Sequence, residues 1–246
     1  MALKIDAKGI YYRQLNEQIK EAVENGEMEI ELVNVNGQRY IGTNLDKPVK
    51  INITGVPGND MAVFMNGPTI IVNNNGQDAI ANTMNAGKIV IHGHAGDVLG
   101  YAMRGGKLFV KGNVGYRVGI HMKEYKKQVP VIIVGGRAGN FFGEYMAGGC
   151  LILLGLNLEP GQPITGDYVG TGMHGGVMYI RGEIEQDKLG KEVRVFDLDE
   201  ADEKKLRELL TEYCAEFGFD LEDIMKEKFI KLLPVSKNPY GRLYCG

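Results

Sequence analysis

Short apolar runs separated by glycine-rich segments dominate the middle of the chain. Between residues 69 and 181 the runs are TIIVN, KIVIH, KLFVK, VIIVG, CLILL and VMYIR. Runs of five β-branched and apolar residues have the usual length and composition of β-strands. The segments between them show no uninterrupted helical stripe, so the pattern predicts a mainly β protein.

The glycines and methionines between these runs repeat with a period of nineteen residues. The clearest unit is GHAGDVLGYAMRGGKLFVK at residues 93–111, and units starting at Gly112, Gly136 and Gly166 reproduce its markers. Two degenerate copies precede it with the same spacing, starting at Gly55 and Asn74. Aligning the copies places six methionines in one column: Met65, Met84, Met103, Met122, Met146 and Met173.

This repeat is too short for a strand with a crossover helix, which needs about thirty residues or more. One turn of a solenoid per repeat fits better, with each strand pairing in parallel with its equivalent one coil away. The sequence therefore predicts a right-handed parallel β-helix of about six coils, with glycines at its corners and the methionines stacked inside. An all-β sandwich is the alternative, but it does not require an identical spacing in successive units.

The flanks are predicted to close the open ends of the solenoid. Residues 13–25 place Leu15, Ile19, Ala22 and Val23 on one face of a helix that ends at Gly26. Two strands, MEIELVNV and GQRYIG, should then form a hairpin through an Asn36-Gly37 turn. Residues 1–50 would make this N-terminal α/β cap, and residues 51–182 the β-helix itself.

Residues 183–246 are predicted to form a C-terminal helical segment and tail. Asp199 or Asp202 could cap a helix that carries the apolar residues from Leu206 to Phe217. A second helical run is expected from Leu221 to about Leu232, before Pro234. The tail SKNPYGRLYCG is loop-like.

Composition narrows the functional classes. Apolar residues make up 44% and charged residues 24%, while the net charge of −3 gives no electrostatic case for nucleic acid or an anionic membrane. The N-terminus lacks the apolar core of a signal peptide, and no apolar stretch reaches about 18 residues. Three scattered cysteines, Cys150, Cys214 and Cys245, favour a reduced, cytoplasmic chain.

Several motifs suggest chemistry but are better explained by the repeat. GTGMHG at residues 170–175 formally matches a dinucleotide-binding loop, yet a strand follows it where that loop needs a helix. His92 and His94 could bind a metal only with further ligands, so solvent-facing corner positions are favoured. Cys150 opens an apolar run, which favours a buried thiol over a nucleophile. No serine lies in a GxSxG elbow.

A docking face is the remaining candidate site. The residues after each column methionine are Asn66, Asn85, Arg104, Lys123, Ala147 and His174. Stacked coils would align them as a polar, partly basic ladder, and a charged insertion from Lys123 to Val129 lies beside it. Insertions in solenoids often mark the binding side. We therefore expect Arg104, Arg117, His121 and Lys123 to face a partner, with a merely solvated surface as the alternative.

The units GDVLGYAMRGG, GYRVGIHMKEY, GEYMAGG and GTGMHGG, with the entry segment NVNGQRYIGTNL, resemble the C-terminal GXGXG domain of the glutamate synthase large subunit. The resemblance covers nearly the whole chain. In that family the glutaminase nucleophile is an N-terminal Cys of another domain, and FMN and an iron–sulfur cluster bind the synthase barrel. This chain carries none of those motifs.

The resemblance therefore implies a non-catalytic subunit or domain of an enzyme that makes glutamate from glutamine and 2-oxoglutarate in nitrogen assimilation. Its partners would be the glutaminase and synthase components, which would hold FMN and the iron–sulfur cluster, while this chain binds no cofactor. A subunit of formylmethanofuran dehydrogenase, a molybdenum or tungsten enzyme, shares the same β-helix and is an alternative. A free-standing ligand-binding or hydrolytic solenoid is a third possibility.

Overall fold

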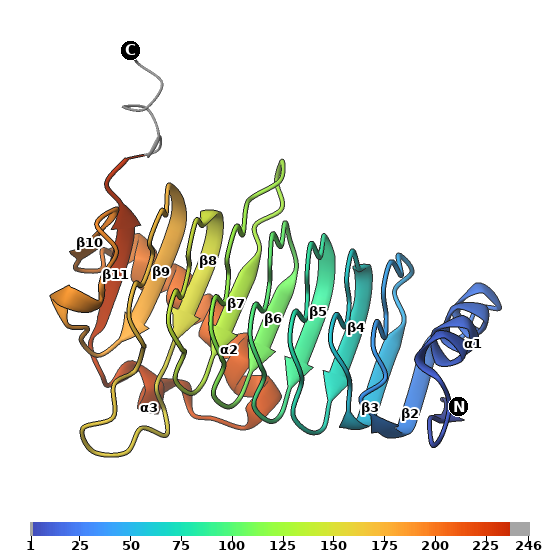
Figure 1. Cartoon of the computed structure of the whole chain (residues 1–246). Coiled ribbons are helices and arrows are strands. Elements are labelled where there is room, and N and C mark those ends of the chain that lie inside the picture. The colour runs from blue at the N-terminus through green and yellow to red at the C-terminus, as the bar shows by residue number, and fades with distance from the viewer. Residues whose placement is uncertain (1, 237–246) are drawn as a thin grey trace, which may run out of the picture.

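The apolar runs form strands of a single sheet in the computed structural model, which describes residues 2–236 (Figure 1). The sheet contains 11 strands in the order β1 to β9, then β11 and β10, and β1–β9 pair in parallel. Their bounds are β1 Leu3–Asp6, β2 Glu29–Asn36, β3 Lys50–Val56, β4 Asn66–Val72, β5 Ala86–Ile91, β6 Lys107–Val110, β7 Val131–Val134, β8 Ala147–Leu153, β9 Gly175–Arg181, β10 Val193–Phe196 and β11 Phe229–Pro234.

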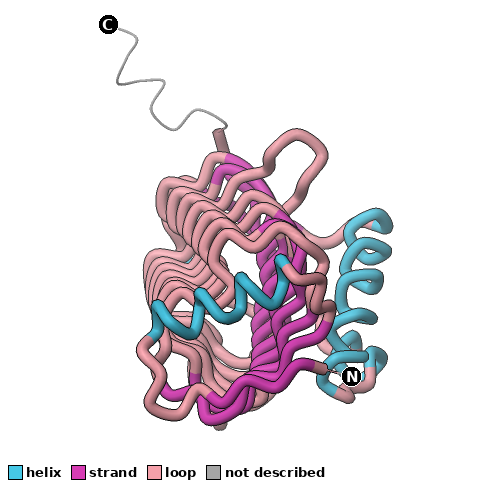
Figure 2. Tube along the Cα trace, turned by 90° about the vertical axis from the view of Figure 1, so that its right-hand side faces the viewer, coloured by secondary structure: helices cyan, strands magenta, loops and turns pink. Residues whose placement is uncertain are grey.

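The strand register confirms the nineteen-residue period. Each of these residues pairs with the next: Lys50, Thr69, Lys88, Lys107, Val131, Cys150 and Val177. The step exceeds nineteen residues only where loops are inserted before β7 and before β9. The chain therefore winds as a mainly β, right-handed parallel β-helix of about six coils, seen end-on in Figure 2.

The interior of the coils is filled by one continuous apolar core. The six methionines of the predicted column all have 0% exposure, which confirms their internal position. Inward-facing Ile, Val and Leu residues from the strands stack against them, for example Ile70, Ile89 and Leu108. Each coil alone could not bury its apolar side, so stability comes from the stacking of neighbours.

Ahead of most strands runs an arc in which alternate residues are left-handed. Positive φ recurs at the first, third and fifth residues of 40–44, 60–64, 79–83, 98–102, 117–121, 141–145 and 168–172. In the coil at 117–121 the φ angles are 56° at Arg117, 74° at Gly119 and 55° at His121. Gly119 donates its N–H to the preceding coil (Leu99 O, 2.8 Å), while Arg117 and His121 donate to the following one. In the last arc, Gly170 and Gly172 occupy two of these left-handed positions.

The middle position of the arc faces the core, which explains its small residues. A Cβ on Gly100 would lie 2.4 Å from Ile132 Cδ1, and one on Gly119 would lie 2.7 Å from Leu151 Cδ1. The same column holds alanine at Ala62 and Ala81 in the N-terminal coils. Most first and fifth positions are at least partly exposed and accept large side chains, such as Arg117 and Tyr145.

Side-chain ladders join the coils in the segments that precede the arcs. Asn75 Oδ1 accepts the His94 N–H at 2.8 Å, His94 Nδ1 accepts the Asn113 N–H at 2.8 Å, and Asn113 Oδ1 accepts the Arg137 N–H. A second ladder runs through Asp78 and Asp97 to the Tyr116 N–H. These bonds satisfy backbone donors that the bends leave without a sheet partner.

The helix α1, Tyr12–Glu24, lies across the N-terminal end of the solenoid, as Figure 2 shows. The predicted face of Leu15, Ile19, Ala22 and Val23 is buried, so α1 is the expected cap. The hairpin prediction at Asn36-Gly37 is wrong. β2 pairs in parallel with β1 and β3, and residues 37–49 instead form the first coil return. The Asn36-Gly37 sequence, which suits a hairpin turn, lies at a corner of the solenoid instead.

The C-terminal helix α2, Glu200–Phe217, begins at Asp199 with a capping box completed by Asp202. It packs along the outer face of the sheet, visible beside the strands in Figure 2. Its Leu206, Leu210, Tyr213 and Phe217 form a second core with outward-facing strand residues such as Phe109 and Ile133. A 3₁₀ turn, η1 Gln186–Lys188, leads from β9 toward β10.

The predicted second helical run is too long. Helix α3 spans only Leu221–Met225, and β11 replaces the rest by pairing antiparallel with both β9 and β10. The open edge of β9 offers unpaired backbone groups, so strand pairing outweighs the local helical pattern. The tail from residue 237 lies outside the described residues. Across residues 2–236, none of the helices is both long and apolar enough to cross a membrane.

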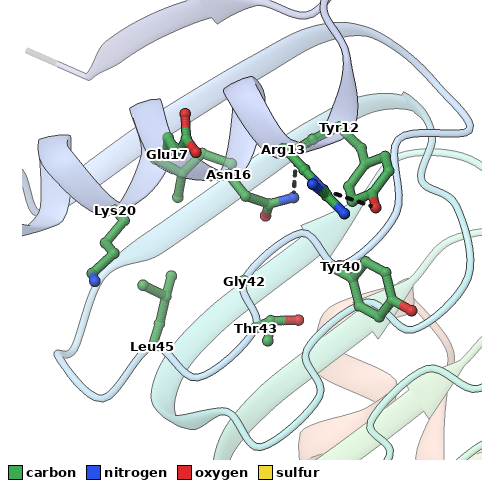
Figure 3. A pocket seen from close by; sticks show the side chains of 10 residues that line it. Tyr12, Arg13, Asn16, Glu17, Lys20, Tyr40, Gly42, Thr43 and Leu45 are labelled. Carbon is green, nitrogen blue, oxygen red and sulfur yellow. Dashed lines mark hydrogen bonds between the residues drawn. The ribbon is translucent and has the colours of Figure 1, made fainter.

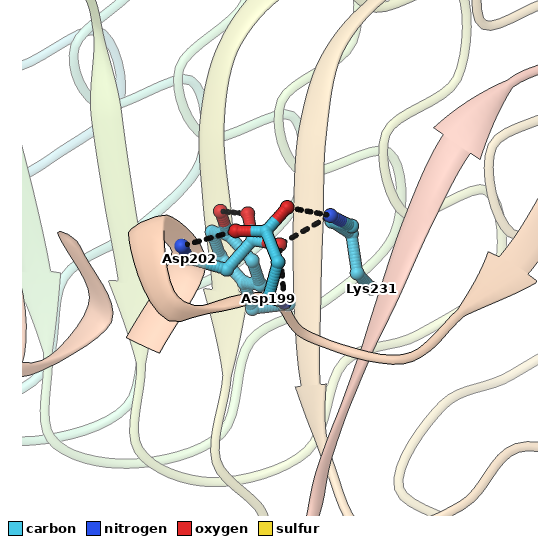
Figure 4. A network of polar contacts seen from close by, with 4 residues as sticks. Asp199, Asp202 and Lys231 are labelled. Carbon is cyan, nitrogen blue, oxygen red and sulfur yellow. Dashed lines mark hydrogen bonds and ion pairs between the residues drawn. The ribbon is translucent and has the colours of Figure 1, made fainter. Parts of the chain in front are cut away.

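A polar network ties the start of α2 to the C-terminal strands (Figure 4). Lys231 of β11 forms ion pairs with Asp202 and with Asp199 Oδ2 (3.3 Å), and the Tyr179 hydroxyl donates to Asp202 Oδ1 at 2.6 Å. Burial alone would raise the pKa of Asp202, but hydrogen bonds from Lys231 and Tyr179 lower it below its ordinary value. Burial and the bond to Asp202 raise the pKa of Tyr179.

Replacing Lys231 with methionine should destabilise the chain by about 2 kcal/mol at pH 7, because the Asp202 carboxylate loses its cationic partner. A group with a lowered folded-state pKa contributes stability that is lost as the pH falls through that pKa. The difference in unfolding free energy between wild type and Lys231→Met, measured with urea, should therefore narrow as the pH is lowered below the ordinary range of a carboxyl pKa. Lys226→Met, which removes an exposed pair with Asp223, serves as the control and should change little.

Candidate docking surface

Four consecutive arcs present their outward side chains on one strip of the surface. We call this the docking strip: the outward side chains of residues 98–104, 117–123, 141–147 and 168–174. The backbone fixes their spacing, since equivalent residues on adjacent coils are hydrogen-bonded neighbours. Stacked strands lie about 4.8 Å apart, which is close enough for aromatic rings on successive coils to touch.

Three rings stack in the middle of the docking strip. The His121 and Tyr145 rings are parallel, with centroids 5.2 Å apart and an interplanar angle of 9°. Tyr101 meets His121 edge-on at 5.8 Å. Tyr101 is 38% exposed, so the stack presents aromatic surface to solvent. Aromatic pairs of this kind are each worth about 0.5–1.5 kcal/mol, and exposed stacks of them are typical of protein interfaces.

A second stack of Arg117, Phe141 and Tyr168 lies beside the first. The Arg117 guanidinium lies over the Phe141 ring at 4.6 Å, and Phe141 stacks on Tyr168 at 4.9 Å. Glu144 Oε2 accepts from Arg117 Nε at 2.9 Å, and its carboxylate is nearly buried. Glu144 therefore fixes the guanidinium in place, while Tyr168 remains 55% exposed.

Two of the four predicted docking residues thus belong to these stacks, and the other two border them. The backbone N–H groups of Arg104 and Lys123 donate to Met84 O and Met103 O, one coil earlier in each case. These bonds place the two residues at equivalent positions of adjacent coils, as the ladder prediction requires. Both residues are exposed, and within residues 2–236 neither side chain forms an ion pair, so the border of the strip carries two positive charges without a paired carboxylate.

A shallow cleft continues the strip at its C-terminal side. Lys123, Ala147 and His174 lie on successive coils of the same ladder and line it, with Leu233 and Pro234 of β11 as the opposite wall. His174 Nδ1 lies 3.0 Å from Gly172 O, which fixes the imidazole orientation. The small Ala147 leaves the space between the two basic residues.

The remaining sequence candidates have structural roles. Gly170 and Gly172 are left-handed residues of the last arc, and β9 follows them, so GTGMHG belongs to the repeat. Cys150 is fully buried, and burial raises the pKa of its thiol to about 12. An ionised nucleophile is disfavoured there.

The two histidines of the corner differ from one another. His94 is exposed and serves the backbone ladder. The prediction that His92 faces solvent is wrong, because its ring packs edge-on against Phe217 of α2 at 5.2 Å. Burial, with a smaller contribution from Lys111, lowers the pKa of His92. The sequence could not show that α2 covers this edge of the sheet.

Sequence reasoning identified Arg117 and His121 but missed their aromatic neighbours. The available signal was the register: Tyr145 follows His121 at the same place of the next coil, and Tyr168 follows Phe141. Aligning the outward positions of the arcs, rather than only the residues after each methionine, would have revealed both stacks.

A known family model, that of the GXGXG motif, matches residues 11–235 of the chain. The chain belongs to the GXGXG family. An uncharacterized protein of Methanocaldococcus jannaschii is 51% identical over 250 residues, which cover 98% of this chain and 95% of that protein.

A solved structure shares the architecture of this GXGXG chain. The formyltransferase/hydrolase complex from Methylorubrum extorquens, in complex with methylofuran, contains a chain that matches with a TM-score of 0.60 and 21% identity. The match covers 91% of this chain and 88% of that chain. At this identity the similarity establishes a shared fold.

Proposed function

We propose that this GXGXG chain is a non-catalytic scaffold of a cytoplasmic glutamate synthase complex, which converts glutamine and 2-oxoglutarate to glutamate. In this role it binds the glutaminase and synthase components and fixes their relative position. FMN and the iron–sulfur cluster belong to those partners. The observation that carries the proposal is the docking strip, in which two exposed aromatic stacks are held on a regular array of coils. The match of the GXGXG family model to residues 11–235 supports it.

The physical properties of the strip suit docking better than catalysis. Its aromatic and arginine side chains are the types enriched at the energetic centres of interfaces. They are held by the backbone register and by Glu144, so little side-chain entropy is lost when a partner binds. Coupled enzymes transfer an intermediate between components most efficiently when their geometry is fixed, and a β-helix is a stiff spacer.

A second candidate is an equivalent β-helix subunit of a formylmethanofuran dehydrogenase-like molybdenum or tungsten enzyme. The shared fold with a chain of a formyltransferase/hydrolase complex is the observation that favours it. Under either proposal the chain acts as one component of a larger assembly.

The test is reconstitution. The chain is combined with purified glutaminase and synthase polypeptides, and glutamate formation from glutamine and 2-oxoglutarate is compared with and without it. We expect omission to lower the glutamine-dependent rate at least tenfold, because the ammonia released by one component is no longer delivered to the other. Glutamine hydrolysis by the glutaminase alone should persist, which provides the internal control.

An unchanged glutamine-dependent rate, together with no binding of either polypeptide, would contradict the glutamate synthase role. The second candidate is tested in parallel with formylmethanofuran dehydrogenase polypeptides. A stable complex formed only with those polypeptides would replace the first proposal by the second.

A further inference from the structure

A cleft lies between α1 and the first coil of the solenoid, and its residues, 12–45, are separate from those of the docking strip. It encloses about 280 Å³, close to the lower end of small-molecule sites (Figure 3). One wall is formed by side chains of α1, namely Tyr12, Arg13 and Lys20, and the other by side chains of the coil, including Tyr40 and Leu45. Its accessible lining is mainly apolar.

The walls of the cleft are connected before any ligand binds. The Asn16 side-chain amide donates to Tyr12 O at 2.7 Å and to Arg39 O at 2.8 Å, which joins the helix to the coil. The Tyr12 and Tyr40 rings lie 5.7 Å apart at 50°, and the Arg39 guanidinium stacks over Tyr40. The two rings contact one another, so they form one aromatic end of a preformed cleft, which favours a flat apolar body packed against them.

One polar atom in the lining lacks a partner. Thr43 Oγ1 is buried without a hydrogen bond, the one side-chain atom of this kind within the described residues. A buried hydroxyl without a partner destabilises the folded chain, and a ligand in the cleft that bonds this hydroxyl would remove that cost.

The rim of the cleft carries more positive than negative charge. Arg13 and Lys20 are its cations and Glu17 its anion. Lys20 also pairs with Glu24 at 3.7 Å, but both side chains are more than 60% exposed, so this pair contributes little and can exchange. A carboxylate at the rim would therefore find an available ammonium group.

We propose that this cleft is a binding site for a small carboxylic acid with a flat, apolar body. The body lies along the cleft over Leu45 with its far end against the Tyr12 and Tyr40 rings, the carboxylate is bound by Lys20 at the opposite end, and the Thr43 hydroxyl bonds a polar group of the ligand. The site is independent of the scaffold role, because it lies at the N-terminal cap and needs no partner polypeptide.

The probe is 4-hydroxyphenylacetate, titrated into the isotope-labelled 246-residue chain and followed by amide NMR shifts. We expect the shifts to map to residues 12–20 and 40–45, with a Kd on the order of 0.1–1 mM for a ligand of this size. Two comparison ligands separate the contributions. 4-Hydroxyphenylethanol lacks the carboxylate and 2-oxoglutarate lacks the ring, and each should bind at least fivefold more weakly.

Variants assign the contacts. Lys20→Glu should weaken 4-hydroxyphenylacetate at least fivefold and leave 4-hydroxyphenylethanol unchanged, whereas Lys204→Glu on α2 should alter neither. Thr43→Val should weaken the acid about threefold and raise the melting temperature of the free chain, since it removes an unpaired buried hydroxyl. Absence of shifts in these segments at 5 mM, or equal affinity for the acid and the alcohol, would overturn the proposal.

Discussion

Gly119→Val is expected to destabilise the chain by about 4 kcal/mol or more, a large share of the 5–15 kcal/mol typical of whole domains. The residue has a φ of 74°, where a β-branched side chain is strained by about 1–3 kcal/mol. Its new Cβ would also lie 2.7 Å from Leu151 Cδ1 in the core, and overpacking adds a similar cost. Urea unfolding followed by circular dichroism measures the effect, since the chain has no Trp.

The matched control is a substitution to glycine at another residue of the same core-facing column. Ala81 occupies the equivalent left-handed position with a φ of 63° and is fully buried. Ala81→Gly relieves the backbone strain but loses one buried methyl group, so we expect a net change within about 1 kcal/mol. A Gly119→Val variant as stable as Ala81→Gly would show that the arc does not have the geometry described.

This contrast shows why the repeat was visible in the sequence. Positions that point into the core through a left-handed backbone accept only glycine or alanine, and positions that follow the turn accept methionine. Both constraints recur in every coil because each coil faces the same neighbours. The presence of the strands and the methionine column followed from these local requirements, although strands such as β4 and β8 begin earlier than the apolar runs, and the buried face of α1 followed from its helical spacing.

Other features depended on contacts that no local pattern records. Asn36-Gly37 suits a hairpin as well as a solenoid corner, and only the pairing of β2 with β3 distinguishes them. Residues after Met225 have apolar residues at helical spacing, yet the free edge of β9 draws them into β11. His92 is half-buried because α2 lies over it, and α2 is held there by its apolar face, with ion pairs such as Lys88–Glu216 and Lys107–Glu212 beside it.

The candidate site was predictable in part for the same reason. Arg104 and Lys123 were found because their positions are fixed relative to the methionines. The aromatic stacks arise from residues that match only when the five-residue insertion before β7 and the longer one before β9 are removed from the register. Physical proximity across coils, rather than residue type along the chain, defines the docking strip.

Truncating the docking strip is the second change with a large expected effect. Tyr145→Ala removes the ring that stacks on His121, and Tyr168→Ala removes the exposed ring over Phe141. If the strip is the docking surface, each variant should weaken binding to the partner polypeptides about 30-fold, as loss of a central aromatic contact typically costs about 2 kcal/mol. Affinity is measured by titrating the purified chain against immobilised glutaminase and synthase polypeptides.

Two controls separate a specific interface from a general loss of stability or charge. Phe196→Ala trims a ring on β10 that is 47% exposed and lies outside the strip, so it should leave affinity unchanged. The double variant Arg104→Glu, Lys123→Glu reverses the charge at the border and should mainly slow association, with an effect that fades as salt is raised. Full affinity in both tyrosine variants would exclude the strip and leave the opposite side of the coils as the scaffold's binding face. Loss of affinity only in the charge-reversed variant would instead show that Arg104 and Lys123 contact the partner and that the aromatic stacks only support them.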